Sequence, residues 1–147
     1  MSSAVQRPIL IVEDSHEDFA IIERALGKAA VTNTVNRCRD GYDALDYLHQ
    51  RGPHTDADRS LRPAVILLDL NLPGMSGVEL LEAIKTDDRF KDIPVVVLTT
   101  SAEGSDVRRC YALGAAGYIK KPIHPAMLVK AFQNFAAYWF ETVSLPQ

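Results

Sequence analysis

Several features that mark secreted, membrane-bound or nucleic-acid-binding proteins are missing from this sequence. Its only two cysteines, Cys38 and Cys110, lie far apart and without metal-site spacing, so we expect reduced thiols. The apolar runs are a few residues long, well short of a membrane span. A net charge of −3, without any cluster of lysine and arginine, argues against a nucleic-acid-binding surface. The N-terminus shows no signal peptide, so we expect a cytoplasmic protein with no membrane contact.

The composition is that of one folded domain. Hydrophobic residues make up 47% and charged residues 24% of the 147 residues, a balance that supports a packed core and excludes general disorder. The length suits one domain better than two. We expect a single domain over residues 1–147, with its core at about residues 8–140 and a short extension at each end.

Short apolar runs punctuate the sequence in the manner of buried parallel strands. Those at residues 8–12, 64–68 and 93–98 do not alternate with polar residues, as is typical of strands covered on both faces. A fourth run covers residues 117–119, and the alternating segment 33–38 fits an edge strand. Helical stretches lie between these runs, so we predict an α/β fold with a doubly wound parallel sheet and helices on both faces.

Helix starts are visible in the sequence. Ser15 followed by Asp18, and Ser76 followed by Glu79, have the spacing of N-terminal caps. Proline at position 125 suits the first turn of a final helix, which we expect to run from about residue 125 to residue 140. The one loop-like insertion covers residues 52–63. His49 and His54 bracket it beside two aspartates, but their spacing does not suggest a zinc site.

Polar residues follow the apolar runs where each predicted strand ends. Because the carboxyl ends of parallel strands meet at one edge of the sheet, these residues should converge, although they are far apart in sequence. Crowded carboxylates repel one another, and Mg²⁺ relieves that repulsion best, since it prefers hard oxygen ligands. A lysine and a threonine would bind the oxygens of a phosphoryl group on an aspartate. The five residues are Glu13, Asp14, Asp69, Thr99 and Lys121.

This pattern resembles the receiver domain of bacterial two-component response regulators. Thirty residues separate Asp69 from Thr99 and 22 separate Thr99 from Lys121, as in that family. The runs 69–77 and 114–118 also resemble family segments, and the likeness covers roughly residues 8–138. It implies a flavodoxin-like sheet with strand order 2-1-3-4-5, and a signalling protein rather than an enzyme.

The resemblance also implies a role for each site residue. Asp69 would accept phosphate from a histidine kinase, and Mg²⁺ would be held by Glu13, Asp14, Asp69 and the backbone carbonyl of Asn71. Three further residues would respond to phosphorylation: Thr99 would swing toward the phosphoryl group, Lys121 would pair with its oxygens, and Tyr118 would rotate inward. The bond before Pro122 would be cis. Such a chain, ending soon after its last helix, would signal by protein contact.

Two features resemble a narrower branch, the small regulators paired with bacterial and cyanobacterial phytochromes. These are the loop at residues 52–63 and an aromatic tail at residues 135–146. The likeness implies a light-sensing kinase as partner and a homodimer formed through the last helix and strand. The final helix also carries more aromatic residues than one buried face needs, which is typical of an interface. We expect the partner surface to include Phe132, Phe135, Tyr138, Trp139 and Phe140.

Two residues depart from the commoner family pattern. Glu13 replaces an aspartate, and Thr100 fills a place that is usually alanine or glycine, where it could narrow access to Asp69.

A phosphatase of the haloacid dehalogenase type would need an acid where Asn71 stands. A nucleotide or flavin binder would need a glycine-rich loop after the first strand, which is acidic here. A receiver-like interaction module that does not depend on phosphorylation stays open as the alternative.

Overall fold

Parallel strands form one sheet at the centre of the molecule. The computed structural model describes residues 7–55, 62–100 and 104–136. The strand order is β2-β1-β3-β4-β5, as predicted, and the pairing is parallel throughout. The predicted alternating segment forms β2, at one edge of the sheet. The strands are β1 (Ile9–Val12), β2 (Val35–Cys38), β3 (Val65–Asp69), β4 (Val95–Thr99) and β5 (Gly117–Lys120).

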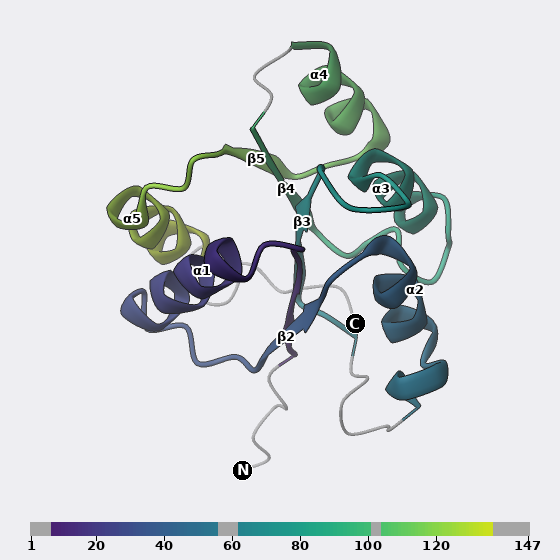
Figure 1. The fold of residues 1–147 in the computed structure, drawn as a ribbon, viewed down its shortest axis with the longest axis horizontal. Coiled ribbons are helices and arrows are strands. Elements are labelled where there is room, and N and C mark those ends of the chain that lie inside the picture. Colours follow the sequence, from purple (N-terminus) through teal and green to yellow (C-terminus); the bar gives the residue numbers. More distant parts are fainter. Residues whose placement is uncertain (1–6, 56–61, 101–103, 137–147) are drawn as a thin grey trace.

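Helices cover both faces of this sheet, which confirms the predicted doubly wound architecture. Helices α1 and α5 lie on one face, and α2, α3 and α4 lie on the other (Figure 1). Ser15 and Ser76 cap α1 and α3, accepting hydrogen bonds from the backbone N–H groups of Asp18 and Glu79. The helices are α1 (His16–Lys28), α2 (Gly41–His49), the 3₁₀ turn η1 (Gly52–His54), α3 (Gly77–Lys85), α4 (Gly104–Leu113) and α5 (Pro125–Ala136).

Successive residues of the central strands point to opposite faces and fill two separate cores. Ile9 and Ile11 of β1 pack with α1 and α5, whereas Leu10 and Val12 pack with the helices of the other face. All four are at most 2% exposed. Burial of each such side chain stabilises the fold by about 1.5–3 kcal/mol. Because β1 and β3 are buried on both faces, their carboxyl ends are held rigidly.

The final helix differs in one respect from the sequence-based prediction. Phe132 is only 6% exposed and packs in the core between α5, α1 and the sheet. Its assignment to an exposed partner surface is therefore wrong, because the side chain is needed to cover the sheet. The other four residues of the expected partner surface cannot be placed in this way. Tyr138, Trp139 and Phe140 lie outside the described residues, and so does the side chain of Phe135.

The structure bears on two expectations from the sequence, namely reduced cysteines and the absence of a membrane-spanning helix. Cys38 and Cys110 are free, as predicted, and both are buried. Among the described residues, no helix has both the length and the apolar character needed to cross a membrane.

Candidate functional site

Three of the predicted site residues meet at the carboxyl edge of the sheet. The Lys121 ammonium Nζ lies 2.7 Å from Glu13 Oε1 and 3.2 Å from Asp69 Oδ2. Glu13 follows β1, Asp69 ends β3, and Lys121 follows β5, so the parallel topology alone brings them together. Glu13 is fully buried, while Asp69 and Lys121 are 3% and 7% exposed. Charged groups this deeply buried are rare unless they are paired, as these are.

A third carboxylate completes the shell around the lysine. Asp18, in the first turn of α1, accepts a hydrogen bond from Lys121 Nζ at 2.8 Å. An ammonium group has three N–H donors, and here each has a carboxylate partner. The sequence analysis found Asp18 only as part of a helix cap. Its distance of three residues from Ser15 was the available signal, but the reach of its side chain to Lys121 depends on how α1 packs.

Three carboxylates surround one ammonium at this site, so negative charge is in excess. Burial, assisted by Asp69, raises the pKa of Glu13 to about 7 despite its bond to Lys121. Burial alone would lower the pKa of Lys121, but the hydrogen bonds to Asp18 and Glu13 and the charge of Asp69 raise it above its ordinary value. One ammonium therefore does not neutralise the surrounding carboxylates, and the site favours a further cation.

Backbone N–H groups orient the two buried carboxylates. Asn71 N donates to Asp69 Oδ1 at 3.0 Å, and Ser15 N donates to Glu13 Oε2 at 3.0 Å. The Asn71 side chain in turn donates from Nδ2 to Thr100 Oγ1 at 3.0 Å, on the exposed side of the site. Thr100 thus forms part of the rim around Asp69, consistent with the expected narrowing of access.

Asp14 is exposed at the same edge, beside an arginine that the sequence analysis missed. Arg37 of β2 donates to the backbone carbonyls of Glu13 and Asp14, at 3.1 Å each. Its guanidinium also lies 4.9 Å from the centre of the Phe19 ring. Arg37 therefore holds the loop between β1 and α1 in place. The alternation of β2 indicated an edge strand but gave no signal for this contact. His16, the first residue of α1, is exposed, and its Nδ1 lies 3.3 Å from a guanidinium nitrogen of Arg37.

Two of the expected switch residues, Thr99 and Tyr118, lie on the last two strands of the sheet, β4 and β5. Thr99 ends β4 and is 1% exposed, and its carbonyl accepts the Lys121 N–H at 2.7 Å. Tyr118 of β5 is 46% exposed and lies edge-on against Tyr111 of α4, with ring centres 6.3 Å apart. The Lys121–Pro122 peptide bond is cis. Tyr118 thus lies outside the site in this structure, with its ring against α4.

The donor chemistry of this edge fits a divalent cation. Glu13, Asp14 and Asp69 supply carboxylate oxygens, and Asn71 can add its backbone carbonyl. These are the hard oxygen ligands that Mg²⁺ prefers. Such a cation would offset the negative charge that remains when three carboxylates surround the single ammonium of Lys121.

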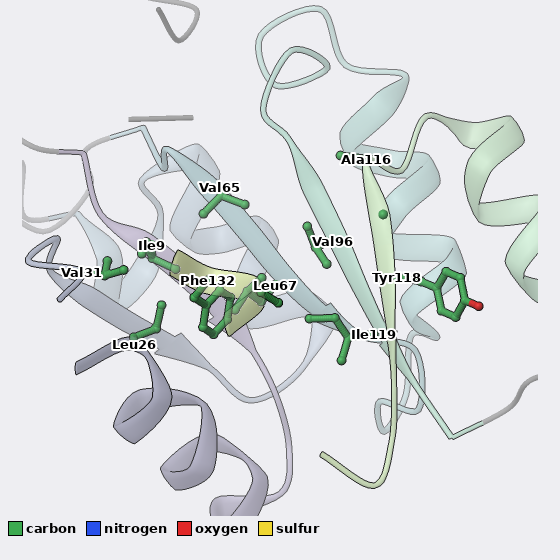
Figure 2. A pocket seen from close by; sticks show the side chains of 12 residues that line it. Ile9, Leu26, Val31, Val65, Leu67, Val96, Ala116, Tyr118, Ile119 and Phe132 are labelled. Carbon is green, nitrogen blue, oxygen red and sulfur yellow. The ribbon is translucent and has the colours of Figure 1, made fainter. Parts of the chain in front are cut away.

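A separate apolar cavity lies at the opposite end of the sheet. It measures about 200 Å³ and lies between the sheet and helices α1 and α5. Leu67, Ile119 and Phe132 point into it, whereas the Tyr118 ring points away (Figure 2). Because the side chains that point into it are apolar, it can take no part in the chemistry of the carboxylate edge.

Comparisons with known proteins agree with this geometry. The sequence profile of the response regulator receiver domain matches residues 9–133. Response regulator Rcp1 of Synechocystis sp. is 41% identical over 138 residues, covering 94% of this chain and 92% of Rcp1. The phosphorylated cyanobacterial phytochrome response regulator RcpA has a similar structure, with a TM-score of 0.84 and 39% identity over 97% of this chain and 99% of RcpA. The Mn²⁺-bound form of Rcp1 gives a TM-score of 0.82 and 40% identity over 96% of this chain and 99% of Rcp1.

Proposed function

The chain belongs to the response regulator receiver domain family, and from that premise we propose that it carries its phosphoryl group on Asp69. It is a phosphorylation-dependent response regulator and not a conventional enzyme. One observation carries the assignment: Asp69 ends the central strand β3, and its carboxylate contacts the buried Lys121 ammonium. Receiver domains bind a divalent metal, and Rcp1 has a Mn²⁺-bound form.

In this protein we infer that the metal is Mg²⁺, held by Glu13, Asp14, Asp69 and the carbonyl of Asn71. The charge balance supports this, since several carboxylates face one ammonium. When bound, Mg²⁺ neutralises charge on the carboxylates and on the incoming phosphoryl oxygens. The backbone N–H of Asn71 keeps Asp69 oriented for attack, with a hydrogen bond of 3.0 Å.

The proposed transfer needs no other protein nucleophile. An oxygen of Asp69 forms a bond to phosphorus, and the bond from phosphorus to the kinase histidine breaks, so that the imidazole leaves. The Lys121 ammonium exchanges a carboxylate partner for a phosphoryl oxygen. Charge-assisted hydrogen bonds of this kind stabilise the added negative charge where it develops.

The phosphoryl group then acts as a switch. It adds about −1.5 to −2 charges and three strong acceptors, which attract the hydroxyl of Thr99 and the ammonium of Lys121. Tyr118 moves inward from its exposed place against Tyr111. This shifts an equilibrium between two packings of β5 and α4, and the surface they form is read by a protein partner.

The assignment of Asp69 is tested by incubation with acetyl phosphate and measurement of the intact mass. We expect the gain of one phosphoryl group with Mg²⁺, none with a chelator, and none in Asp69→Asn. Asp88→Asn is the matched control, because the Asp88 side chain is 93% exposed and pairs with Lys91 on the surface. Equal labelling of both variants would contradict the proposal, and absence of labelling in every protein would favour a phosphorylation-independent module.

We further propose that the phosphate donor is a phytochrome histidine kinase. The similarity to Rcp1 and RcpA supports this, since RcpA is a cyanobacterial phytochrome response regulator. Phosphotransfer from such a kinase should change between its red-absorbing and far-red-absorbing states, and should outpace transfer from a chemotaxis kinase. A preference for the chemotaxis kinase would contradict the proposal.

We also propose that the protein forms a homodimer through the end of its last helix and the tail. The aromatic content of residues 135–140 supports this proposal. Sedimentation velocity should show a dimer at tens of micromolar, and replacement of Tyr138, Trp139 and Phe140 by serine should give a monomer. Phe132 is not replaced by serine in this variant, because its side chain belongs to the core. A monomer with and without beryllofluoride would contradict the proposal.

A further inference from the structure

A second group of metal-ligating side chains lies where β2 meets α2, on the face of the sheet opposite α1 and α5 (Figure 1). Its backbone adjoins the carboxylate edge, because Glu13 N donates to the Cys38 carbonyl at 3.0 Å. Cys38 ends β2, Asp43 lies in the first turn of α2, and His54 ends η1. One ligand atom from each residue lies within 4.8 Å of the other two. The proposed function of the protein uses none of these three side chains.

We propose that Cys38, Asp43 and His54 form a binding site for Zn²⁺. Thiolate, carboxylate and imidazole are the ligand types with which proteins bind zinc, and three protein ligands leave the fourth position to water. Ligand atoms around a tetrahedral zinc ion lie about 3–4 Å apart, so small rotations of these side chains would close the site. The sulfur ligand argues against Mg²⁺, which prefers oxygen.

The three side chains are arranged from solvent inward. The His54 and Asp43 side chains are 19% and 34% exposed, whereas Cys38 is fully buried beneath them. An ion can therefore reach the carboxylate and the imidazole first and the sulfur last. The His54 ring lies edge-on against Tyr47, with ring centres 5.3 Å apart, which restricts its orientation. The carboxylate and the imidazole therefore lie nearer the surface, and the sulfur lies in the core.

Without metal, protons hold these groups together. His54 Nε2 lies 2.7 Å from Asp43 Oδ1, and the Cys38 sulfur lies within 4.8 Å of a ligand atom of each. Burial, together with the charges of Asp43, Asp40 and Asp46, raises the pKa of the thiol above its ordinary range. The carboxylates beside the thiol would attract a divalent cation, which would take the place of the thiol proton.

Metal binding would exchange these protons for metal bonds without any change of oxidation state. The S–H bond of Cys38 breaks, a sulfur–metal bond forms, and the thiol proton leaves to solvent. The imidazole binds through Nε2 in its neutral form, with its proton on Nδ1, while Asp43 changes from hydrogen-bond acceptor to ligand. The bound ion would link η1, at the start of the inserted loop, to the end of β2.

Cobalt spectroscopy tests this site separately from the carboxylate edge. Co²⁺ replaces Zn²⁺ in tetrahedral sites and gives a charge-transfer absorption only when bound by a thiolate. With excess Mg²⁺ present, we expect this band to saturate at one Co²⁺ per chain, to disappear on addition of Zn²⁺, and to accompany the release of one proton. Absence of the band at stoichiometric Co²⁺ would overturn the proposal and leave a hydrogen-bonded triad.

Matched variants identify the ligands. Cys38→Ser should lose the band, while Cys110→Ser, which removes the other buried thiol, should keep it. His54→Gln, at a partly exposed position, should weaken Co²⁺ binding at least about tenfold. Asp69→Asn should keep the band, so failure of the phosphorylation proposal would leave this one intact. A band that survives Cys38→Ser, or unchanged affinity in His54→Gln, would overturn the assignment.

Discussion

Gly77 holds the loop after Asp69 in place because it has no side chain. It is the first residue of α3, it is buried, and its N–H donates to the carbonyl of Leu70 at 3.0 Å. A Cβ added there would lie 2.4 Å from Leu70 Cα and 2.5 Å from the carbonyl oxygen of Asp69. Both are backbone atoms, which cannot rotate away as a side chain can. Gly77→Ala therefore forces α3 and the loop apart by roughly 1 Å.

The expected magnitude follows from this displacement. Overpacking of a rigid site costs about 1–3 kcal/mol, and the backbone contacts of Gly77→Ala place it at the upper end. A loss of about 3 kcal/mol corresponds to a fall in Tm of roughly 6–12 °C for a chain of this size. Because the loop positions Asp69 and Asn71, phosphorylation by acetyl phosphate should also slow by at least about tenfold.

The assay compares two glycine substitutions. Gly27→Ala is the matched control, because a Cβ there meets nothing within 4 Å and the residue lies in α1. Alanine is the better helix former, so Gly27→Ala should stabilise the protein by about 0.5–1 kcal/mol and leave phosphorylation unchanged. Urea denaturation measures both variants. Gly77→Ala with wild-type stability would refute the reasoning.

Three further substitutions test the surroundings of the site. Asp18→Asn keeps the side-chain shape but removes one carboxylate bonded to Lys121; it should weaken Mg²⁺ binding about fivefold, measured by calorimetry, and unchanged affinity would contradict this. Thr100→Ala removes the exposed acceptor of the Asn71 amide; it should change stability by less than about 1 kcal/mol and raise the initial rate of acetyl phosphate labelling, and a slower rate would count against a narrowing role. Tyr118→Ala, at a 46% exposed position, should alter stability by about 1 kcal/mol or less but abolish the NMR shift changes that beryllofluoride causes in α4; their persistence would remove Tyr118 from the switch.

The parts that could be predicted from the sequence depend on periodicity and strand ends. Uninterrupted apolar runs identified β1, β3 and β4, and alternation identified β2 as the edge. Since parallel strands end at one edge, the polar residues after them had to converge there. The contacts of Lys121 with Glu13 and Asp69 follow from that topology alone.

The parts that could not be predicted depend on packing between elements. Asp18 reaches Lys121 only because α1 lies against the sheet at a particular angle, which no local spacing encodes. His54 approaches Cys38 and Asp43 through the path of a loop, so the spacing of His49 and His54 gave no indication of it. Phe132 shows a limit of the helical stripe: its spacing fits both a residue that covers the sheet and a residue of a partner surface, and only the packing of α5 decides between them.

The site of phosphorylation is the central claim, and chemical trapping tests it most directly. Borohydride reduces an aspartyl phosphate to homoserine, so peptide sequencing by mass spectrometry identifies the residue that carried the phosphoryl group. After labelling with acetyl phosphate and Mg²⁺, we expect homoserine at position 69 and an unmodified Asp14, the exposed carboxylate at the same edge. Homoserine at position 14 would contradict the account. So would a protein whose intact mass shows one phosphoryl group but whose peptide containing Asp69 is unmodified after reduction.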